Sequence, residues 1–171
     1  MFFSLNGIET ANFYEFKEWT ALNFPLHCHY SLEVVFVRAG NITVEIEKKK
    51  YLLSKGDSIA IMPFEKHSFI TEKEEFSDVF IFQVSPKLIS NWDACFGGKS
   101  FENPRCSFSD SKISRLYSEL SEAGENLIKL NAAFFGIMNA YLVGNKLIPN
   151  STVNDTCLSA LKYISENYSN D

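Results

Sequence analysis

The residues best suited to chemistry are three histidines and a glutamate. His27, His29 and Glu33 precede Gly40 in the pattern H-x-H-x3-E-x6-G. In an extended strand, residues of equal parity project to the same face, so we expect His27, His29 and Glu33 to converge from one strand. Two imidazoles and a carboxylate on one face can bind a divalent metal ion or a polar ligand.

A fourth polar group comes from a later segment. His67 stands just after Pro63 and follows Gly56 by eleven residues. A barrel can bring this second strand opposite the first, which would add a fourth inward polar group. Two interpretations stay open at this point: the four groups form a ligand site, or the histidines are structural residues at a barrel mouth and Glu33 is a solvated strand residue.

Short β-type runs must position these groups. We expect strands near Phe13–Trp19, Leu32–Arg38, Ile42–Glu47, Tyr51–Leu53, Ser58–Met62, His67–Thr71 and Phe76–Val84. Strands at spacings of roughly ten residues, separated by turn residues, favour a sandwich or a barrel. The run Leu32–Val37 is apolar on both faces, which predicts burial on both, inside the barrel and under another layer outside it.

Helical patterns follow residue 84. Ser85 as N-cap and Pro86 in the first turn predict a short helix to about Cys95. A second helix is expected from Ser109 or Asp110 to Gly124, and a third over residues 125–143. The third is apolar over a wide arc, so it needs two partners, the barrel and a second surface. A linker near residue 149 then leads to a last helix over Val153–Tyr168.

Composition excludes several classes of protein. The chain has 171 residues, 46% of them hydrophobic and 22% charged, which is typical of a globular protein. Its net charge of −5 and lack of a basic face argue against binding of nucleic acid by these residues alone. The four cysteines form no C-x-x-C pair, and we expect neither a signal peptide nor a membrane span. We therefore expect a reduced cytoplasmic protein without a membrane partner.

The two histidine-bearing segments resemble the two motifs of the cupin superfamily over residues 20 to 84. In that family, two His and a Glu of the first motif and one His of the second bind a metal ion. His27, His29, Glu33, Gly40, Gly56 and His67 stand in matching register. Ala21 replaces the leading glycine, Phe64 replaces a glycine of the second motif, and Pro63 comes one residue late. Because of the second motif's departures, we expect no bound metal and no cofactor; if a metal binds, the ligands are His27, His29, Glu33 and His67.

A fuller resemblance is to the amino-terminal part of AraC-type transcription regulators. It rests on the order of the short sequence motifs at residues 24–29, 32–37, 55–63 and 67–69, and on the helical segments at 111–143 and 160–168. The resemblance implies a barrel that binds a small effector and helices that form a homodimer. It also implies DNA binding only through a helix-turn-helix part that is missing here.

The sequence thus predicts an α+β chain, with a cupin-like double-stranded β-helix (jelly-roll barrel) followed by a helical dimerisation region. The expected divisions are a barrel at 1–95, dimerisation helices at 96–148, and a linker with the start of a helix-turn-helix domain at 149–171. The effector, with a sugar among the candidates, is expected to contact His27, His29, Glu33, His67, Trp19, Tyr51, Phe69 and Phe82. The dimer contacts are expected at Leu127, Leu130, Phe134, Phe135, Ile137, Met138 and Tyr141. No catalytic residue is expected; the alternative function is a metal-dependent cupin enzyme, such as a dioxygenase or isomerase.

Overall fold

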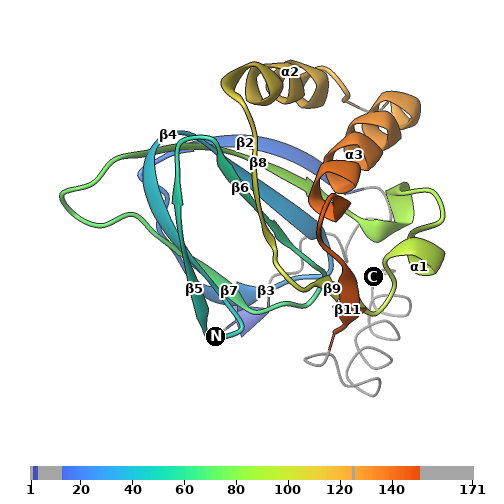
Figure 1. Cartoon of the computed structure of the whole chain (residues 1–171), viewed down its shortest axis with the longest axis horizontal. Coiled ribbons are helices and arrows are strands. Elements are labelled where there is room, and N and C mark those ends of the chain that lie inside the picture. The colour runs from blue at the N-terminus through green and yellow to red at the C-terminus, as the bar shows by residue number, and fades with distance from the viewer. Residues whose placement is uncertain (1, 4–12, 125, 151–171) are drawn as a thin grey trace, which may run out of the picture.

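The structure is a computed structural model that describes residues 2–3, 13–124 and 126–150, and the last predicted helix, Val153–Tyr168, lies outside them. Figure 1 shows a β-barrel with helices along one side. The strands are β1 (Phe2–Phe3), β2 (Tyr14–Thr20), β3 (Phe24–Cys28), β4 (Leu32–Ile46), β5 (Lys49–Ser54), β6 (Asp57–Ile61), β7 (His67–Ile70), β8 (Ser77–Val84), β9 (Lys99–Phe101), β10 (Arg105–Ser107) and β11 (Leu147–Pro149). The helices are η1 (Pro86–Leu88), α1 (Trp92–Cys95), α2 (Asp110–Ser121) and α3 (Leu127–Leu142).

Two sheets share the longest strand, β4. Its first half, up to Gly40, pairs antiparallel with β6 and β8, and its second half, from Asn41, pairs antiparallel with β5 and β7. Neighbouring strands extend one sheet to β2-β8-β4-β6-β10 and the other to β1-β3-β7-β4-β5. This is the predicted double-stranded β-helix in an α+β chain, and this part of the fold prediction is confirmed, whereas the dimerisation role of the helices stays a prediction.

The bend in β4 depends on Gly40. The sequence predicts two strands with a turn between them, but the chain stays in the sheet through a register shift between Val37 and Ala39. Gly40 has a φ of +72°, and a Cβ atom there would lie 1.8 Å from the carbonyl oxygen of Phe76. Only glycine fits this conformation next to that carbonyl group.

The first half of β4 separates two apolar cores, as its sequence predicts. Val35 and Val37 pack inside the barrel with residues such as Ile59 and Phe69. Alternate residues of β4 point the other way, where Val34 and others pack with the helices. The helical layer therefore covers the outer face of the sheet that contains β8, β4 and β6.

The two longer helices form where the sequence predicts them. Ser109 caps α2 through a hydrogen bond from Lys112 N, and Asn126 caps α3. The predicted helix at 85–95 is wrong in part, because Asn91 takes a left-handed conformation and separates η1 from α1. The short strands β9, β10 and β11 are missing from the sequence prediction. None of the helices in the described parts of the chain is long and apolar enough to cross a membrane.

Candidate functional site

Three imidazole rings meet inside the barrel where β3 and β7 pair. His27 on β3 and His67 on β7 are register partners, and their ring centroids lie 4.1 Å apart. His29 follows β3, with its ring centroid 4.9 Å from that of His67. One ligand atom from each of the three rings lies within 4.8 Å of the others. The structure therefore brings His67 next to His27 and His29, from which it is distant in the sequence.

Glu33 reaches these rings from the opposite sheet. The prediction that His27, His29 and Glu33 share one strand is wrong, because β3 ends at Cys28 and a bend at Tyr30 and Ser31 leads the chain into β4. The parity argument assumed an uninterrupted strand. The groups still converge: Glu33 Oε2 lies 2.9 Å from His29 Nε2 and 3.9 Å from His67 Nε2.

Backbone carbonyl groups fix the orientation of two of the rings. His27 Nδ1 donates to the carbonyl oxygen of Pro25 at 2.9 Å, and His67 Nδ1 donates to that of Glu65 at 2.8 Å. We assign the proton to Nδ1 in both rings because a carbonyl oxygen only accepts. In a neutral ring, Nε2 then keeps its lone pair.

A polar chain extends behind His29. Gln83 Nε2 donates to Ser31 Oγ at 2.8 Å, and Ser31 Oγ lies 3.0 Å from His29 Nδ1. His29 Nδ1 lies 3.0 Å from both the hydroxyl and the carbonyl oxygen of Ser31, and His29 Nε2 lies 2.9 Å from Glu33 Oε2. This chain holds one carboxylate oxygen of Glu33 in place and leaves the other oxygen for a different partner.

Burial and charge set the protonation of the cluster. Burial alone would raise the pKa of Glu33, but the hydrogen bond from His29 and the nearby histidines bring the pKa below its ordinary value. Burial, reinforced by His29 and His27, lowers the pKa of His67 to about 3. Burial also lowers the pKa of His27. At neutral pH, an ionised Glu33 therefore lies beside neutral rings of His27 and His67.

Two atoms of the cluster lack a partner. Among the residues that the structure describes, Glu33 Oε1 and His67 Nε2 are buried without any hydrogen bond. Both are acceptors in the protonation states assigned above. A buried acceptor without a donor is costly, so the cluster is suited to an occupant that brings positive charge or hydrogen-bond donors.

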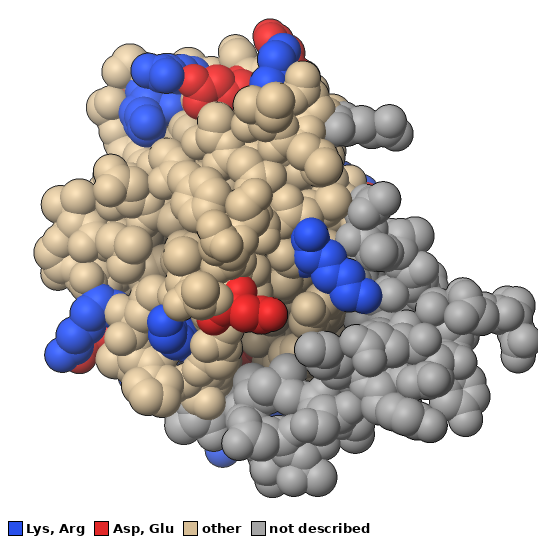
Figure 2. Space-filling model, turned by 90° about the vertical axis from the view of Figure 1, so that its right-hand side faces the viewer, with Lys and Arg blue, Asp and Glu red and all other residues tan. Residues whose placement is uncertain are grey.

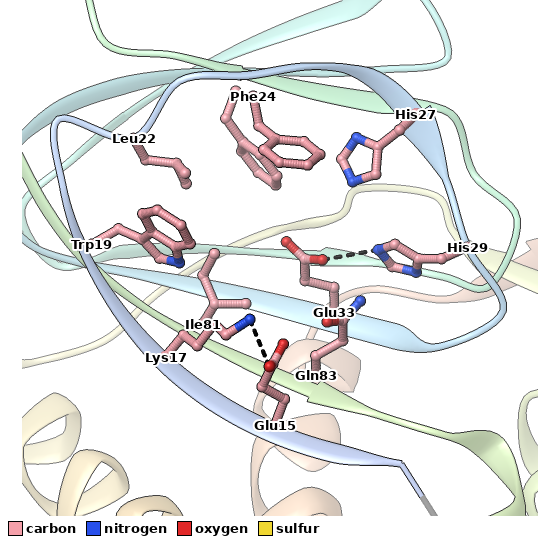
Figure 3. Close-up of a pocket in the computed structure, with 11 residues that line it drawn as sticks. Glu15, Lys17, Trp19, Leu22, Phe24, His27, His29, Glu33, Ile81 and Gln83 are labelled. Atoms are coloured by element: carbon pink, nitrogen blue, oxygen red, sulfur yellow. Dashed lines mark hydrogen bonds and ion pairs between the residues drawn. The ribbon is translucent and has the colours of Figure 1, made fainter. Parts of the chain in front are cut away.

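A pocket of about 90 Å³ lies in front of this cluster. Figure 3 shows the Glu33 carboxylate pointing into a space that Trp19, Leu22, Phe24 and His27 surround. The full lining is Glu15, Lys17, Trp19, Leu22, Phe24, His27, His29, Glu33, Phe69, Ile81 and Gln83. The site thus combines a few polar groups with a mostly apolar wall, as small-molecule sites commonly do.

Comparison with known protein families assigns the barrel. The family model for the cupin domain matches residues 20–82. These residues form a cupin domain. No curated protein matches the chain.

Three solved structures illustrate the similarity of the cupin domain. One is an RmlC-like cupin family protein from Methanocaldococcus jannaschii, with 12% identity over 44% of this chain and 72% of that chain, at a TM-score of 0.40. A second is the polyketide cyclase RemF from Streptomyces resistomycificus, with 17% identity over 42% and 54% of the two chains, at a TM-score of 0.39. A third is an HTH_3 family transcriptional regulator from Vibrio cholerae, with 18% identity over 43% of each chain, at a TM-score of 0.38.

The two positions where a glycine of the cupin motifs is replaced keep a glycine-like backbone. Ala21 has a φ of 52° and Phe64 a φ of 68°, both in the left-handed region that favours glycine. The second motif therefore retains its turn, and His67 lies in the cluster. The departures at Pro63 and Phe64 therefore do not remove His67 from the cluster. The expected absence of a metal, which was based on these departures, stays a prediction.

The donor set of the cupin domain fits a divalent transition-metal ion. His27, His29, His67 and Glu33 would hold it, because the imidazole atoms converge within 4.8 Å and two buried acceptors lack a partner. Such an ion, when bound, supplies Lewis-acid or redox chemistry at its open coordination positions. The chain's own contribution is the orientation of the rings by carbonyl groups and of Glu33 by His29.

The pocket includes some predicted contacts and excludes others. Trp19 and Phe69 line it with His27, His29 and Glu33, while His67 lies behind them, fully buried. Phe82 is not in the pocket, because its side chain faces the helices and packs against Tyr14. Tyr51 packs against the barrel core and does not line the pocket either. Sequence reasoning did not identify the lining residues Glu15, Lys17, Leu22, Phe24, Ile81 and Gln83.

Five of the predicted dimer contacts require correction. The side chains of these five α3 residues are at most 1% exposed and pack in their own chain's core, so a partner cannot reach them. They are Leu130, Phe134, Ile137, Met138 and Tyr141. Tyr141 also forms a hydrogen bond with Ser58 of the barrel at 2.7 Å. Leu127 and Phe135 are exposed, and their contact with a second copy stays a prediction.

Proposed function

We propose that this chain is the effector-sensing and dimerisation part of an AraC-type transcription regulator. A small effector binds in the pocket of the cupin domain, and its occupancy alters the arrangement of the helices. In this proposal the domain catalyses no reaction, and DNA binding belongs to a helix-turn-helix part that follows these residues.

The observation that carries the proposal is the position of β2 between the pocket and α2. The side chains of Glu15, Lys17 and Trp19 line the pocket from one face of the strand. From the other face, the Tyr14 hydroxyl donates to the carbonyl oxygen of Leu120 in α2. Among the described strands, β2 pairs only with β8, so it lies at the edge of its sheet.

Two further contacts tie β2 to α2. The ring of Phe16 lies 5.3 Å from that of Tyr117, and the Tyr117 hydroxyl donates to Glu18 at 2.7 Å. A ligand that moves β2 therefore disturbs contacts of α2 directly. An effector that prefers one arrangement of β2 shifts the population of helix arrangements toward it.

The exposed face of α3 supports the dimer. Ile128, Phe135 and Leu142 are exposed and recur every seven residues, with Ala132 and Asn139 exposed between them at alternating spacings of four and three. This is the a/d pattern of a helix pair, in which one polar residue such as asparagine can fix the register. Figure 2 views the molecule from the side on which α3 lies in Figure 1 and shows a wide area without charged side chains.

A metal-dependent cupin enzyme is the second candidate function. The observation in its favour is the convergence of three histidines on Glu33, with His67 Nε2 and Glu33 Oε1 unsatisfied among the described residues. The contacts of Tyr14, Phe16 and Glu18 with α2 favour the regulator, because they connect the strand that lines the pocket to the helices.

The experiment that separates the two functions uses the complete gene. For a regulator, codons beyond residue 171 encode a helix-turn-helix, and deletion of the gene changes transcription from a small set of promoters. Elemental analysis of the purified protein then finds no stoichiometric transition metal. About one metal ion per chain, lost in His27→Ala but kept in the neighbouring control Cys28→Ala, would contradict the regulator and favour the enzyme.

A further inference from the structure

We propose that the pocket binds a small organic amine, with its ammonium group against the Glu33 carboxylate and its apolar part against Trp19 and Phe24. The inference rests on the proposed sensing role and names the chemical class of the effector. It follows from the charges, the unsatisfied acceptors and the aromatic side chains of the pocket.

The Glu33 carboxylate keeps one oxygen, Oε1, that accepts no hydrogen bond from the described residues. Apart from two histidines, the ionisable side chains that line the pocket are Glu15, Lys17 and Glu33. Lys17 Nζ lies 2.6 Å from Glu15 Oε1, so these two charges neutralise each other. Within the described parts of the chain, the ion-pair partners of Glu33 are His29 and His67, and neither lysine nor arginine is among them.

An occupant of the pocket makes the burial of this oxygen more costly unless the occupant brings a hydrogen-bond donor. The Glu33 side chain is 5% exposed, and a ligand that fills the pocket removes the remaining water from its carboxylate. Desolvation of a carboxylate oxygen that has no hydrogen-bond donor is unfavourable, whereas an ammonium group supplies both the opposite charge and hydrogen-bond donors. An anionic ligand is disfavoured for the same reason, and no arginine lines the pocket to bind it.

The aromatic wall distinguishes an organic amine from a bare metal ion. Trp19 and Phe24 line the pocket although their side chains are 41% and 38% exposed, so their apolar surface is open to an occupant. Figure 3 shows Trp19 and Phe24 around the space into which the open end of the Glu33 carboxylate points. A metal ion held by the histidines leaves these rings uncovered. An alkylammonium ion covers them and gains cation–π attraction from Trp19.

The test compares three probes of similar size that differ in charge. Protein treated with EDTA and shown to be free of metal is titrated at pH 7 with n-butylamine, butan-1-ol and sodium butanoate. Calorimetry is combined with Trp19 fluorescence in a Trp92→Phe background, because the chain has only two tryptophans. We expect n-butylamine to bind about tenfold or more tightly than butan-1-ol, and butanoate to bind most weakly.

Two variants assign the preference to one carboxylate. Glu33→Gln should bring the affinities for n-butylamine and butan-1-ol within about twofold of each other, whereas the control Glu15→Gln should keep the preference for the amine. Equal or tighter binding of butan-1-ol by the unmodified chain would overturn the proposal, even if Glu33→Gln fails to fold. Binding of Mn²⁺ or Ni²⁺ without binding of n-butylamine would also overturn it. Neither result affects the transcription test, so the amine proposal and the regulator proposal can fail separately.

Discussion

Adjacent phenylalanines of α3 provide a sharp test of which face binds a partner. Phe134 is fully buried, with its ring centroid 5.6 Å from that of Phe96 and 6.0 Å from that of Trp92. Phe135 is 38% exposed and belongs to the stripe with Ile128 and Leu142. We therefore expect Phe134→Glu to destabilise the fold and Phe135→Glu to dissociate the dimer.

The expected magnitudes differ because the two sites differ in burial. Truncation of a buried phenylalanine costs about 3–5 kcal/mol, and an uncompensated carboxylate at the Phe134 site adds to this cost. A domain of ordinary stability has only about 5–15 kcal/mol to lose, so Phe134→Glu should be largely unfolded or strongly destabilised. Phe135 buries part of its ring, and its replacement should lower the free energy of unfolding by about 1–2 kcal/mol.

Urea unfolding measures the destabilisation expected for Phe134→Glu. Light scattering across a range of concentrations measures the dissociation expected for Phe135→Glu. The parent chain should give twice its mass of 19.5 kDa, and Phe135→Glu should approach the mass of one chain while staying folded. A parent that is monomeric at all accessible concentrations would refute the interface. A folded, monomeric Phe134→Glu beside a dimeric Phe135→Glu would show that the assignment of the two helix faces is reversed.

Two further substitutions test the framework of the barrel. Gly40→Ala should lower the free energy of unfolding by more than about 1 kcal/mol, because the new Cβ would lie 1.8 Å from the Phe76 carbonyl oxygen at a φ of +72°. A free energy of unfolding in urea that equals that of the parent would contradict the requirement for glycine at this bend. Burial alone would raise the pKa of Asp57, but hydrogen bonds from Ser54 N, Ser107 and Arg105 lower it below 3.8, so its ionised form stabilises the fold above about pH 4. Asp57→Asn should therefore be less stable than the parent at pH 6, with the gap closing as the pH falls below about 4; a gap that is independent of pH in urea titrations would contradict this reasoning.

The sequence predicts the barrel well because its strands obey a local rule. Ile42, Val44 and Ile46 alternate with polar residues, and all three pack inside the barrel. The helices α2 and α3 carry capping residues at the predicted positions. In contrast, β10 and β11 are three residues long, and their pairing with β6 and β9 is set by contacts that local periodicity does not encode.

The pocket was harder to predict because parity alone does not say which face is interior. In β8, Phe82 faces the helices whereas Ile81 and Gln83 face the pocket. Both faces of this strand are buried, so the presence of an aromatic residue does not indicate which face borders the pocket. Gln83, a polar residue in an apolar strand, was the available signal. Glu15 and Lys17 resemble a solvated strand face and gave no signal that they line a cavity.

The size of the signal that β2 can transmit follows from its contacts with α2. The Tyr14 hydroxyl group is half-buried, and its hydrogen bond to the Leu120 carbonyl group contributes about 1 kcal/mol. Loss or gain of that bond alone would shift the helix equilibrium about fivefold, which is at the lower end of typical allosteric coupling. The hydrogen bond between Tyr117 and Glu18 is exposed to solvent, so it contributes little free energy and mainly orients the two side chains. A pocket ligand that displaces β2 would therefore bias the helices without unfolding them, and such a graded shift is what a reversible sensor requires.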